Sequence, residues 1–176
     1  FYAMKLLLLG TYNQLGYVSL ANKLLNEVNS KNLYFFKFAQ IKISLLEKIE
    51  KNHELLNYLK DLNKEFPNNT DIKILLADKL RKNNNFLESI VFYSEIIKDE
   101  SVANKWSLYY SRGIAYERLN QWEKAENDLL EAIELRPDQP YVLNYLAYSW
   151  LDRNLNVNKA LVMLEKAVKL ESGDAY

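Results

Sequence analysis

The feature that most constrains the fold is a pattern of residues that recurs about every 34 positions. In the clearest copy, small residues stand at Gly113 and Ala125, and Pro137 closes the segment. The next copy has Ala147 and Ala160 at the two small positions, so that Ala160 follows Ala125 by 35 residues. A period of this length is typical of a chain built from stacked copies of one supersecondary unit.

Within each copy, apolar residues are spaced for two helices that lie side by side. Leu143, Leu146 and Trp150 stand three and four positions apart in the first half of the last copy. Leu164 and Ala167 continue the same spacing in its second half. Residues spaced in this way share one face of an α-helix. The small residues mark the closest crossing of the two helices, where a larger side chain would cost roughly 1–3 kcal/mol. Each copy is therefore predicted to be an antiparallel helical hairpin.

Turn-forming residues are scarce, and the prolines fall at the predicted boundaries. The chain has four glycines and three prolines, too few for the many turns of a β-sandwich or barrel. Pro67 and Pro137 follow predicted second helices, and Pro140 opens a first helix. Asparagine is frequent, with a run at residues 83–85, which we interpret as a compositional trend rather than a functional tract. The predicted fold class is all-α.

The composition disfavours several functions. The chain has 23 basic and 23 acidic residues, whereas nucleic-acid binders usually carry a basic surplus, although a local basic patch is compatible with this balance. The absence of cysteine excludes disulfides, thiolate metal sites and thiol nucleophiles. The longest apolar run near the start, Leu6 to Leu9, is far shorter than the ~20 residues that cross a bilayer.

No group of residues indicates catalysis. His53 is the only histidine, so a metal site with several histidine ligands cannot be assembled, and we predict a structural or solvated role for His53 rather than a place in a Ser-His triad. Carboxylate pairs such as Glu123 with Glu126 lie beside Lys124, which favours solvated helix charge over glycosidase chemistry. We therefore predict that the chain is not an enzyme and that it binds no metal or cofactor.

Two segments resemble a known family. Residues 109–137, with Gly113 and Ala125 at the two small positions, resemble the tetratricopeptide repeat, although Arg112 stands where that family has Leu. Residues 143–150 are similar to long bacterial tetratricopeptide proteins. The resemblance implies a right-handed α-α superhelix, or solenoid, of about five antiparallel hairpins around a concave groove.

Dividing the chain by the period gives five repeats and the beginning of a sixth. They are placed at residues 1–34, 35–69, 70–105, 106–139 and 140–174, with 175–176 as the start of a truncated sixth. The repeat at 35–69 is degenerate, because Lys42 and Leu55 occupy its small positions. We expect the natural protein to continue beyond this sequence and the C-terminal end to expose apolar surface. Self-association through that end is expected, either as an artefact of truncation or as a genuine contact.

In this family, partner contacts come from the first helix of each repeat, on the face opposite the second helix. Tyr and Arg are favoured at interface centres, and Asn can hydrogen-bond a peptide backbone. Carried onto this sequence, the candidate groove residues are Phe36, Asp78, Arg81, Lys82, Tyr110, Glu117, Arg118, Tyr141, Asn144, Tyr148 and Asp152. Relatives that clamp the C-terminal carboxylate of heat-shock chaperones use Lys/Asn pairs four residues apart. The corresponding positions here, such as Tyr110 with Ile114, hold no such pair, so a chaperone tail is not the expected partner.

Two aromatic clusters have a second interpretation. One spans residues 34–38, and the other comprises Trp106, Tyr109 and Tyr110. Either could form a stacking platform for nucleic-acid bases. The neutral charge and the helical spacing favour their use as core between repeats.

These observations favour a protein–protein interaction scaffold that binds a peptide or a partner domain in the concave groove. The alternative is a structural spacer or self-assembly module within a longer protein. A nucleic-acid or glycan binder is disfavoured by the zero net charge. We expect a bacterial protein that does not insert into a membrane, and we leave open whether it is cytoplasmic or periplasmic.

Overall fold

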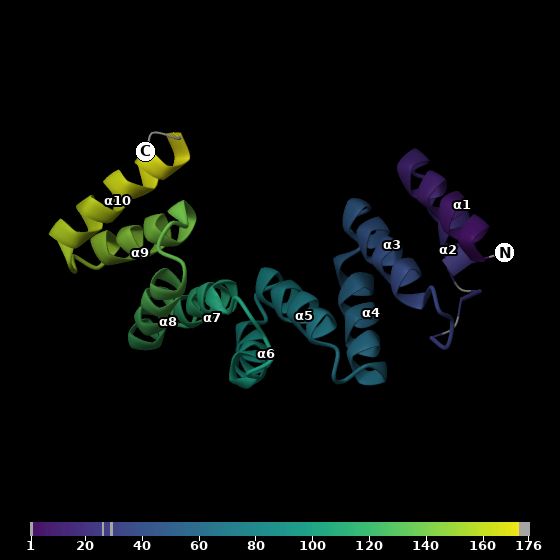
Figure 1. The fold of residues 1–176 in the computed structure, drawn as a ribbon, viewed down its shortest axis with the longest axis horizontal. Helices are drawn as coiled ribbons and strands as arrows, with labels where there is room; N and C mark the ends of the chain where they lie inside the picture. The colour runs from purple at the N-terminus through teal and green to yellow at the C-terminus, as the bar shows by residue number, and fades with distance from the viewer. Residues whose placement is uncertain (1, 26, 29, 173–176) are drawn as a thin grey trace. The chain divides into compact units, whose positions relative to one another are not determined.

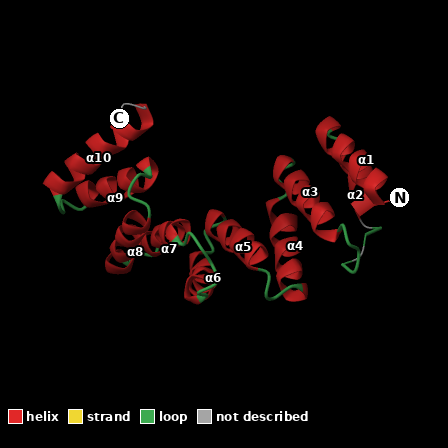
Figure 2. Ribbon diagram, in the orientation of Figure 1, coloured by secondary structure: helices red, strands yellow, loops and turns green. Residues whose placement is uncertain are grey.

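The chain is helical throughout the part that the computed structural model describes, which is residues 2–25, 27–28 and 30–172. These residues form ten α-helices and no β-strand (Figures 1 and 2). The helices are α1 (Tyr2–Leu15), α2 (Val18–Leu25), α3 (Phe35–Lys48), α4 (Asn52–Glu65), α5 (Thr70–Lys82), α6 (Phe86–Lys98), α7 (Trp106–Arg118), α8 (Trp122–Leu135), α9 (Pro140–Asp152) and α10 (Val157–Ser172). The predicted all-α fold class is confirmed.

Two compact units make up the chain, and their boundary lies inside α4. We call residues 1–61 the N-terminal unit and residues 62–176 the C-terminal unit. Each unit is described by itself.

Consecutive helices of the C-terminal unit pair into hairpins. Helix α5 packs on α6, α7 on α8, and α9 on α10. Short turns of three or four residues join the members of each pair, so the paired helices run antiparallel. Neighbouring hairpins also pack on one another, because α6 contacts α7 and α8 contacts α9. The unit is therefore a row of helical hairpins, as the periodicity predicts.

The first helices begin where the predicted repeats begin. Helices α3, α5, α7 and α9 start at Phe35, Thr70, Trp106 and Pro140, the first residues of the second to fifth predicted repeats. The division into repeats stays a prediction, because helix positions alone do not establish it. The predicted sixth repeat at 175–176 lies outside the described residues.

A residue in the left-handed backbone region follows each first helix. The φ angles are +74° at Gly16, +56° at Glu50, +62° at Asn84, +57° at Asn120 and +54° at Asn154. These positions are 34, 34, 36 and 34 residues apart, so the turns follow the same period as the helices. Glycine and asparagine tolerate this conformation better than other residues. The interpretation of the asparagine run as compositional was therefore incomplete, since its middle residue forms a helix-ending turn.

The close helix crossing that the small residues predict is present between α7 and α8. A Cβ atom added to Gly113 would lie 3.1 Å from Leu129 Cγ and 3.3 Å from the backbone oxygen of Ala125. Ala125 and Ala160 are fully buried. A side chain at Gly113 would therefore push α7 away from α8.

The N-terminal unit has its own core, in which α1 packs on α2 and α3. The cluster contains the buried residues Leu9, Ala21, Leu25, Phe38 and Leu45. In the predicted degenerate repeat, the ammonium group of Lys42 lies 4.2 Å from the ring centroid of Tyr58. Burial lowers the pKa of this lysine, and the charge of Glu54 partly opposes that effect. The cation–π contact shows how a large residue is accommodated where other repeats have a small one.

The left-handed conformation of Glu50 allows a test of the turn. Replacing Glu50 with Gly is expected to raise the free energy of unfolding by about 0.5–1 kcal/mol, because relief of backbone strain outweighs the added entropy of the unfolded chain. Urea unfolding followed by circular dichroism at 222 nm would measure the change. The control is Glu47→Gly inside α3, which should lower the free energy of unfolding by about 1 kcal/mol. Equal destabilisation by the two variants would contradict the assignment of the turn.

Candidate functional site

Five aromatic residues of α7 and α9 form a continuous surface that we call the aromatic strip. Its members are Trp106 and Tyr110 of α7 and Tyr141, Tyr145 and Tyr148 of α9. The ring centroids of Trp106 and Tyr141 are 5.8 Å apart, and those of Tyr110 and Tyr141 are 5.3 Å apart. Tyr110 also contacts Tyr145 at 5.8 Å. The spacing of three and four residues puts the α9 tyrosines on one helix face, and α7 supplies the rings that meet them.

Exposure differs along the aromatic strip. The side chain of Tyr148 is 61% exposed and that of Tyr141 is 43% exposed, whereas Tyr110 and Tyr145 are half-buried. Burial, followed by the nearby charge of Glu117, raises the pKa of Tyr145 to about 12. Burial also raises the pKa of Tyr110. The hydroxyl groups of these two residues are therefore protonated at neutral pH. The strip thus combines two half-buried tyrosines, Tyr110 and Tyr145, with two exposed ones, Tyr141 and Tyr148.

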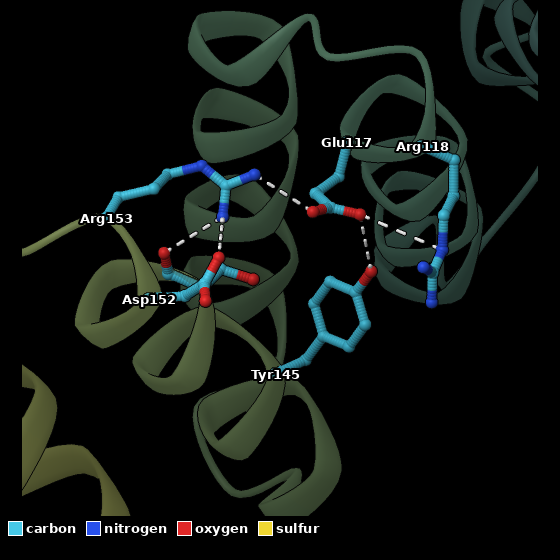
Figure 3. Close-up of polar contacts among 6 residues, drawn as sticks. Glu117, Arg118, Tyr145, Asp152 and Arg153 are labelled. Carbon is cyan, nitrogen blue, oxygen red and sulfur yellow. Dashed lines mark hydrogen bonds and ion pairs between the residues drawn. The ribbon is translucent and has the colours of Figure 1, made fainter.

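A polar network holds one end of the aromatic strip in place (Figure 3). Arg153 donates from Nη2 to Oε1 of Glu117 at 2.9 Å and from Nη1 to the backbone oxygen of Ser149 at 3.1 Å. The hydroxyl group of Tyr145 donates to Oε2 of Glu117 at 3.4 Å. Arg118 Nε lies 3.8 Å from the same carboxylate oxygen. Glu117 therefore ties α7 to α9.

A second set of hydrogen-bonded residues, Asp78, Arg81 and Tyr93, joins the C-terminal end of α5 to α6. Tyr93 of α6 is fully buried, and its hydroxyl group donates to Oδ1 of Asp78 at 2.6 Å. Arg81 donates from Nε to the same hydroxyl oxygen at 3.4 Å. Burial and the charge of Asp78 raise the pKa of Tyr93, although Arg81 opposes the shift. The carboxylate of Asp78 is thus hydrogen-bonded within the α5–α6 hairpin, whereas Lys82 one turn later is exposed.

The structure divides the predicted groove residues into three groups. Helices α7 and α9 carry Tyr110, Glu117, Arg118, Tyr141, Asn144, Tyr148 and Asp152. Helix α5, which contacts α7, carries Asp78, Arg81 and Lys82. Phe36 belongs to the N-terminal unit, where its 44% exposed ring lies 5.7 Å from that of Phe35. The candidate site that we describe is therefore confined to the C-terminal unit.

Sequence reasoning missed three side chains of this surface. Tyr145 follows Tyr141 by four residues, so helical spacing could have identified it. Trp106 was assigned to the core between repeats, and it does contact the next hairpin, but it is only half-buried. The guanidinium carbon of Arg136 lies 6.0 Å from the Trp106 ring centroid. This residue precedes α9 in a turn, where no periodic pattern marks it.

Arg112, which departs from the family pattern, joins three helices. It donates from Nε to Oδ2 of Asp128 at 2.7 Å and from Nη2 to Oδ1 at 2.8 Å. Its Nη1 also donates to Oγ of Ser94 at 2.9 Å. Asp128 is 6% exposed, so the pair is largely removed from water. Burial alone would lower the pKa of Arg112, but the hydrogen bonds and charge of Asp128 raise it above its usual value.

Other classes of site find no support in the described part of the chain. No group of three or more His, Cys, Asp or Glu residues there is arranged to hold a metal ion. His53 is exposed, and its Nδ1 lies 3.3 Å from Nδ2 of Asn57. None of the described helices has both the length and the apolar character needed to span a membrane.

Comparison with known proteins identifies the hairpin at the centre of the candidate site. The model of the tetratricopeptide repeat family matches residues 106–139, which contain α7 and α8. The chain contains a tetratricopeptide repeat. The resemblance found in the sequence is therefore confirmed, with Arg112 as a departure inside the matched repeat.

Solved tetratricopeptide structures share the fold at low sequence identity. A double mutant of MamA from strain RS-1 has a TM-score of 0.78 at 17% identity and covers 97% of both chains. MamA from Desulfovibrio magneticus RS-1, from residue 41 to its end, has a TM-score of 0.71 at 15% identity and covers 98% of both chains. PilW, described as a widely conserved type IV pilus biogenesis factor, has a TM-score of 0.76 at 14% identity and covers 97% of this chain and 77% of its own. Among curated proteins, none matches this sequence.

The buried pair of Arg112 and Asp128 gives a testable stability prediction. Arg112→Leu, which restores the residue typical of the repeat, is expected to lower the free energy of unfolding by about 3 kcal/mol, because it leaves a carboxylate buried without a partner. Combining it with Asp128→Met, the residue found 35 positions later at Met163, should recover most of the loss. Urea unfolding of the two single variants and the double variant would measure the coupling. An Arg112→Leu variant with an unchanged free energy of unfolding would contradict the stabilising role of the pair.

Proposed function

We propose that the C-terminal unit is a protein-interaction scaffold that binds a peptide or a partner domain on the aromatic strip. The tetratricopeptide fold shared with MamA and PilW supports a protein-interaction scaffold in general. Docking on the first helices, which the sequence resemblance implies, is the finer proposal. The observation that carries it is the contiguous contact of four aromatic rings, those of Trp106, Tyr110, Tyr141 and Tyr145, with exposed Tyr148 on the same helix face as Tyr141.

The exposed part of the strip has the chemistry of an interface centre. Tyr141 and Tyr148 are seven residues apart on α9, and exposed Asn144 lies between them on the same face. Tyrosine supplies a large rigid contact area at a low entropy cost, and the amide of asparagine can pair with a peptide backbone. Half-buried Tyr110 contacts the ring of Tyr141 and also that of half-buried Tyr145. The side chains of this surface are thus ordered before a ligand binds.

A non-enzymatic role fits this proposal. The tetratricopeptide fold is typically a scaffold without catalytic activity. Glu117 of α7 and Asp78 of α5 accept hydrogen bonds from Arg153 and Tyr93. We also propose a bacterial origin, which the names of the structural neighbours suggest.

A peptide selection would test docking on the strip. A library of random peptides displayed on phage would be selected against the wild-type chain, and the enriched peptides would be labelled with fluorescein. Fluorescence polarisation is expected to show at least about tenfold weaker binding to the Tyr141→Ala/Tyr148→Ala variant, since central aromatic residues dominate interfaces. Leu87→Ala is the control, because Leu87 lies on α6 and is 69% exposed. Unchanged binding by the tyrosine variant would exclude the strip as the docking site.

A second candidate function, self-assembly, is favoured by the exposed apolar face of α10. In α8, Leu129 is fully buried and Ile133 packs beside it in the cluster that includes Leu146 of α9. The residues 35 positions after the two α8 residues are Leu164 and Val168 of α10, and Val168 is 65% exposed. Leu164 packs against the same cluster, but the end of this α10 face at Val168 is open, whereas the corresponding α8 residue is covered. We propose that a helix from a second copy of the chain covers it, so that the chain acts as an assembly module.

Light scattering after size-exclusion chromatography would test this second candidate. The wild-type chain is expected to show a mass that rises from monomer toward dimer with concentration. Leu161→Glu/Val168→Glu should remain monomeric, because it places two charges on the α10 face. Leu87→Glu is the matched control, with one charge on an exposed position of α6. A monomeric wild type at every concentration would rule out self-assembly through this face.

A further inference from the structure

We propose that the segment docking on the aromatic strip is acidic, and that its carboxylates pair with Arg81, Arg118 and Arg136 at the edges of the strip. We call these three residues the arginine rim. This inference rests on the proposed function, and it specifies the chemistry of the partner. It is carried by the positions of the three guanidinium groups and by the lack, among the described residues, of a carboxylate at ion-pair distance from Arg81 or Arg136.

The arginine rim comes from α5, from α7 and from the turn that follows α8. Arg136 follows α8 and lies against the Trp106 ring, with its guanidinium carbon 6.0 Å from the centroid. Arg118 ends α7, is 59% exposed, and approaches the carboxylate to which Tyr145 donates. Arg81 lies near the end of α5, the helix that contacts α7. Its charge acts on Tyr110, opposing the effect of burial on the pKa of that tyrosine.

Two carboxylates of α7 and α5 already accept hydrogen bonds from neighbouring side chains. Glu117 accepts a hydrogen bond from Arg153 at 2.9 Å, whereas its distance to Arg118 is 3.8 Å. Asp78 accepts a 2.6 Å hydrogen bond from buried Tyr93. Within the described residues, neither Arg81 nor Arg136 lies at ion-pair distance from a carboxylate.

Arg81 and Arg136 therefore have no ion-pair partner among the described residues, although the whole chain has a net charge of zero. Lys82 adds a further exposed positive charge beside Arg81. Guanidinium groups recognise carboxylates through paired, charge-assisted hydrogen bonds, and their planar fork suits this geometry better than an ammonium group does. Aromatic rings between such groups would hold the apolar side chains of the same segment. The complementary ligand is an extended peptide in which Asp or Glu flanks apolar or aromatic residues.

The geometry of the rings favours this peptide over a single-stranded nucleic acid. Tyr110 meets Tyr145 at an interplanar angle of 87° and Tyr141 at 63°, so its ring is enclosed by edge-to-face contacts. Nucleic-acid platforms instead offer open ring faces on which successive bases stack. Only the more exposed Tyr141 and Tyr148 have such faces among the strip tyrosines.

The composition of selected peptides provides the first test. Peptides enriched on the wild-type chain from the random library would be sequenced, and Asp and Glu are expected to be over-represented beside apolar residues. Two fluorescein-labelled probes would then be compared, the consensus peptide and its analogue with every Asp and Glu replaced by Asn and Gln. The acidic probe should bind the wild type at least about tenfold more tightly, a preference that weakens between 50 and 300 mM NaCl.

Charge removal from the rim provides the second test. In the Arg81→Gln/Arg136→Gln variant, the two probes are expected to bind with affinities that differ by less than about twofold. Lys159→Gln/Lys169→Gln removes two exposed charges from α10 and should keep the tenfold preference. Equal loss of preference in the two double variants would overturn the proposal, because it would reveal a non-specific charge effect.

The remaining outcomes separate this inference from the proposed function. Enriched peptides that are neutral or basic, but are lost by Tyr141→Ala/Tyr148→Ala, would overturn the acidic partner and retain docking on the strip. Enriched peptides insensitive to that tyrosine variant would contradict both. A fluorescein-labelled oligouridine is expected to bind more weakly than the acidic probe. Tighter oligouridine binding that depends on Arg81 and Arg136 would overturn the acidic peptide in favour of RNA.

Discussion

The architecture of the C-terminal unit depends on the close approach of two helices within each hairpin. Between α7 and α8 this approach leaves no room for a side chain at Gly113, and fully buried alanines occupy the corresponding second helices. Once the helices of a hairpin are this close, their outward faces can contact the next hairpin. Because a single hairpin cannot bury its apolar face alone, stability arises from these successive contacts. The packing is consequently local, with each hairpin held by its neighbours.

The candidate site follows from this arrangement. Packing of neighbouring hairpins brings α7 and α9 close enough for their aromatic rings to touch, although the rings come from residues more than thirty positions apart. Glu117 and Arg153 then fix the two helices relative to one another at one end of the strip (Figure 3). The surface is therefore built mainly from ordered side chains on helices rather than on loops. A ligand would have little conformational entropy to remove from it.

Helical periodicity predicted the hairpins and the position of every first helix after α1, because apolar spacing and small residues directly record helix packing. The family resemblance gave the candidate groove residues, seven of which lie on α7 and α9, and their role as a binding site stays a prediction. The role of the asparagines was not recognised, although the left-handed residues recur with the period of the helices, because only apolar and small residues were compared between repeats. Periodicity likewise could not show that Arg112 meets Asp128, because a polar pair between helices depends on rotamers and not on spacing. Nor could it reveal which carboxylates near the strip are already paired.

The pair of Arg112 and Asp128 also affects which helices pair with one another during folding. Successive hairpins have nearly the same shape, so a first helix could associate with the wrong second helix at little cost in apolar contacts. Asp128 changes this balance, because any partner other than α7 would bury its carboxylate without a guanidinium group. In α10 the corresponding residue is Met163, which is uncharged and needs no guanidinium partner when buried. The buried pair of Arg112 and Asp128 thus favours the pairing of α7 with α8 over exchanged pairings.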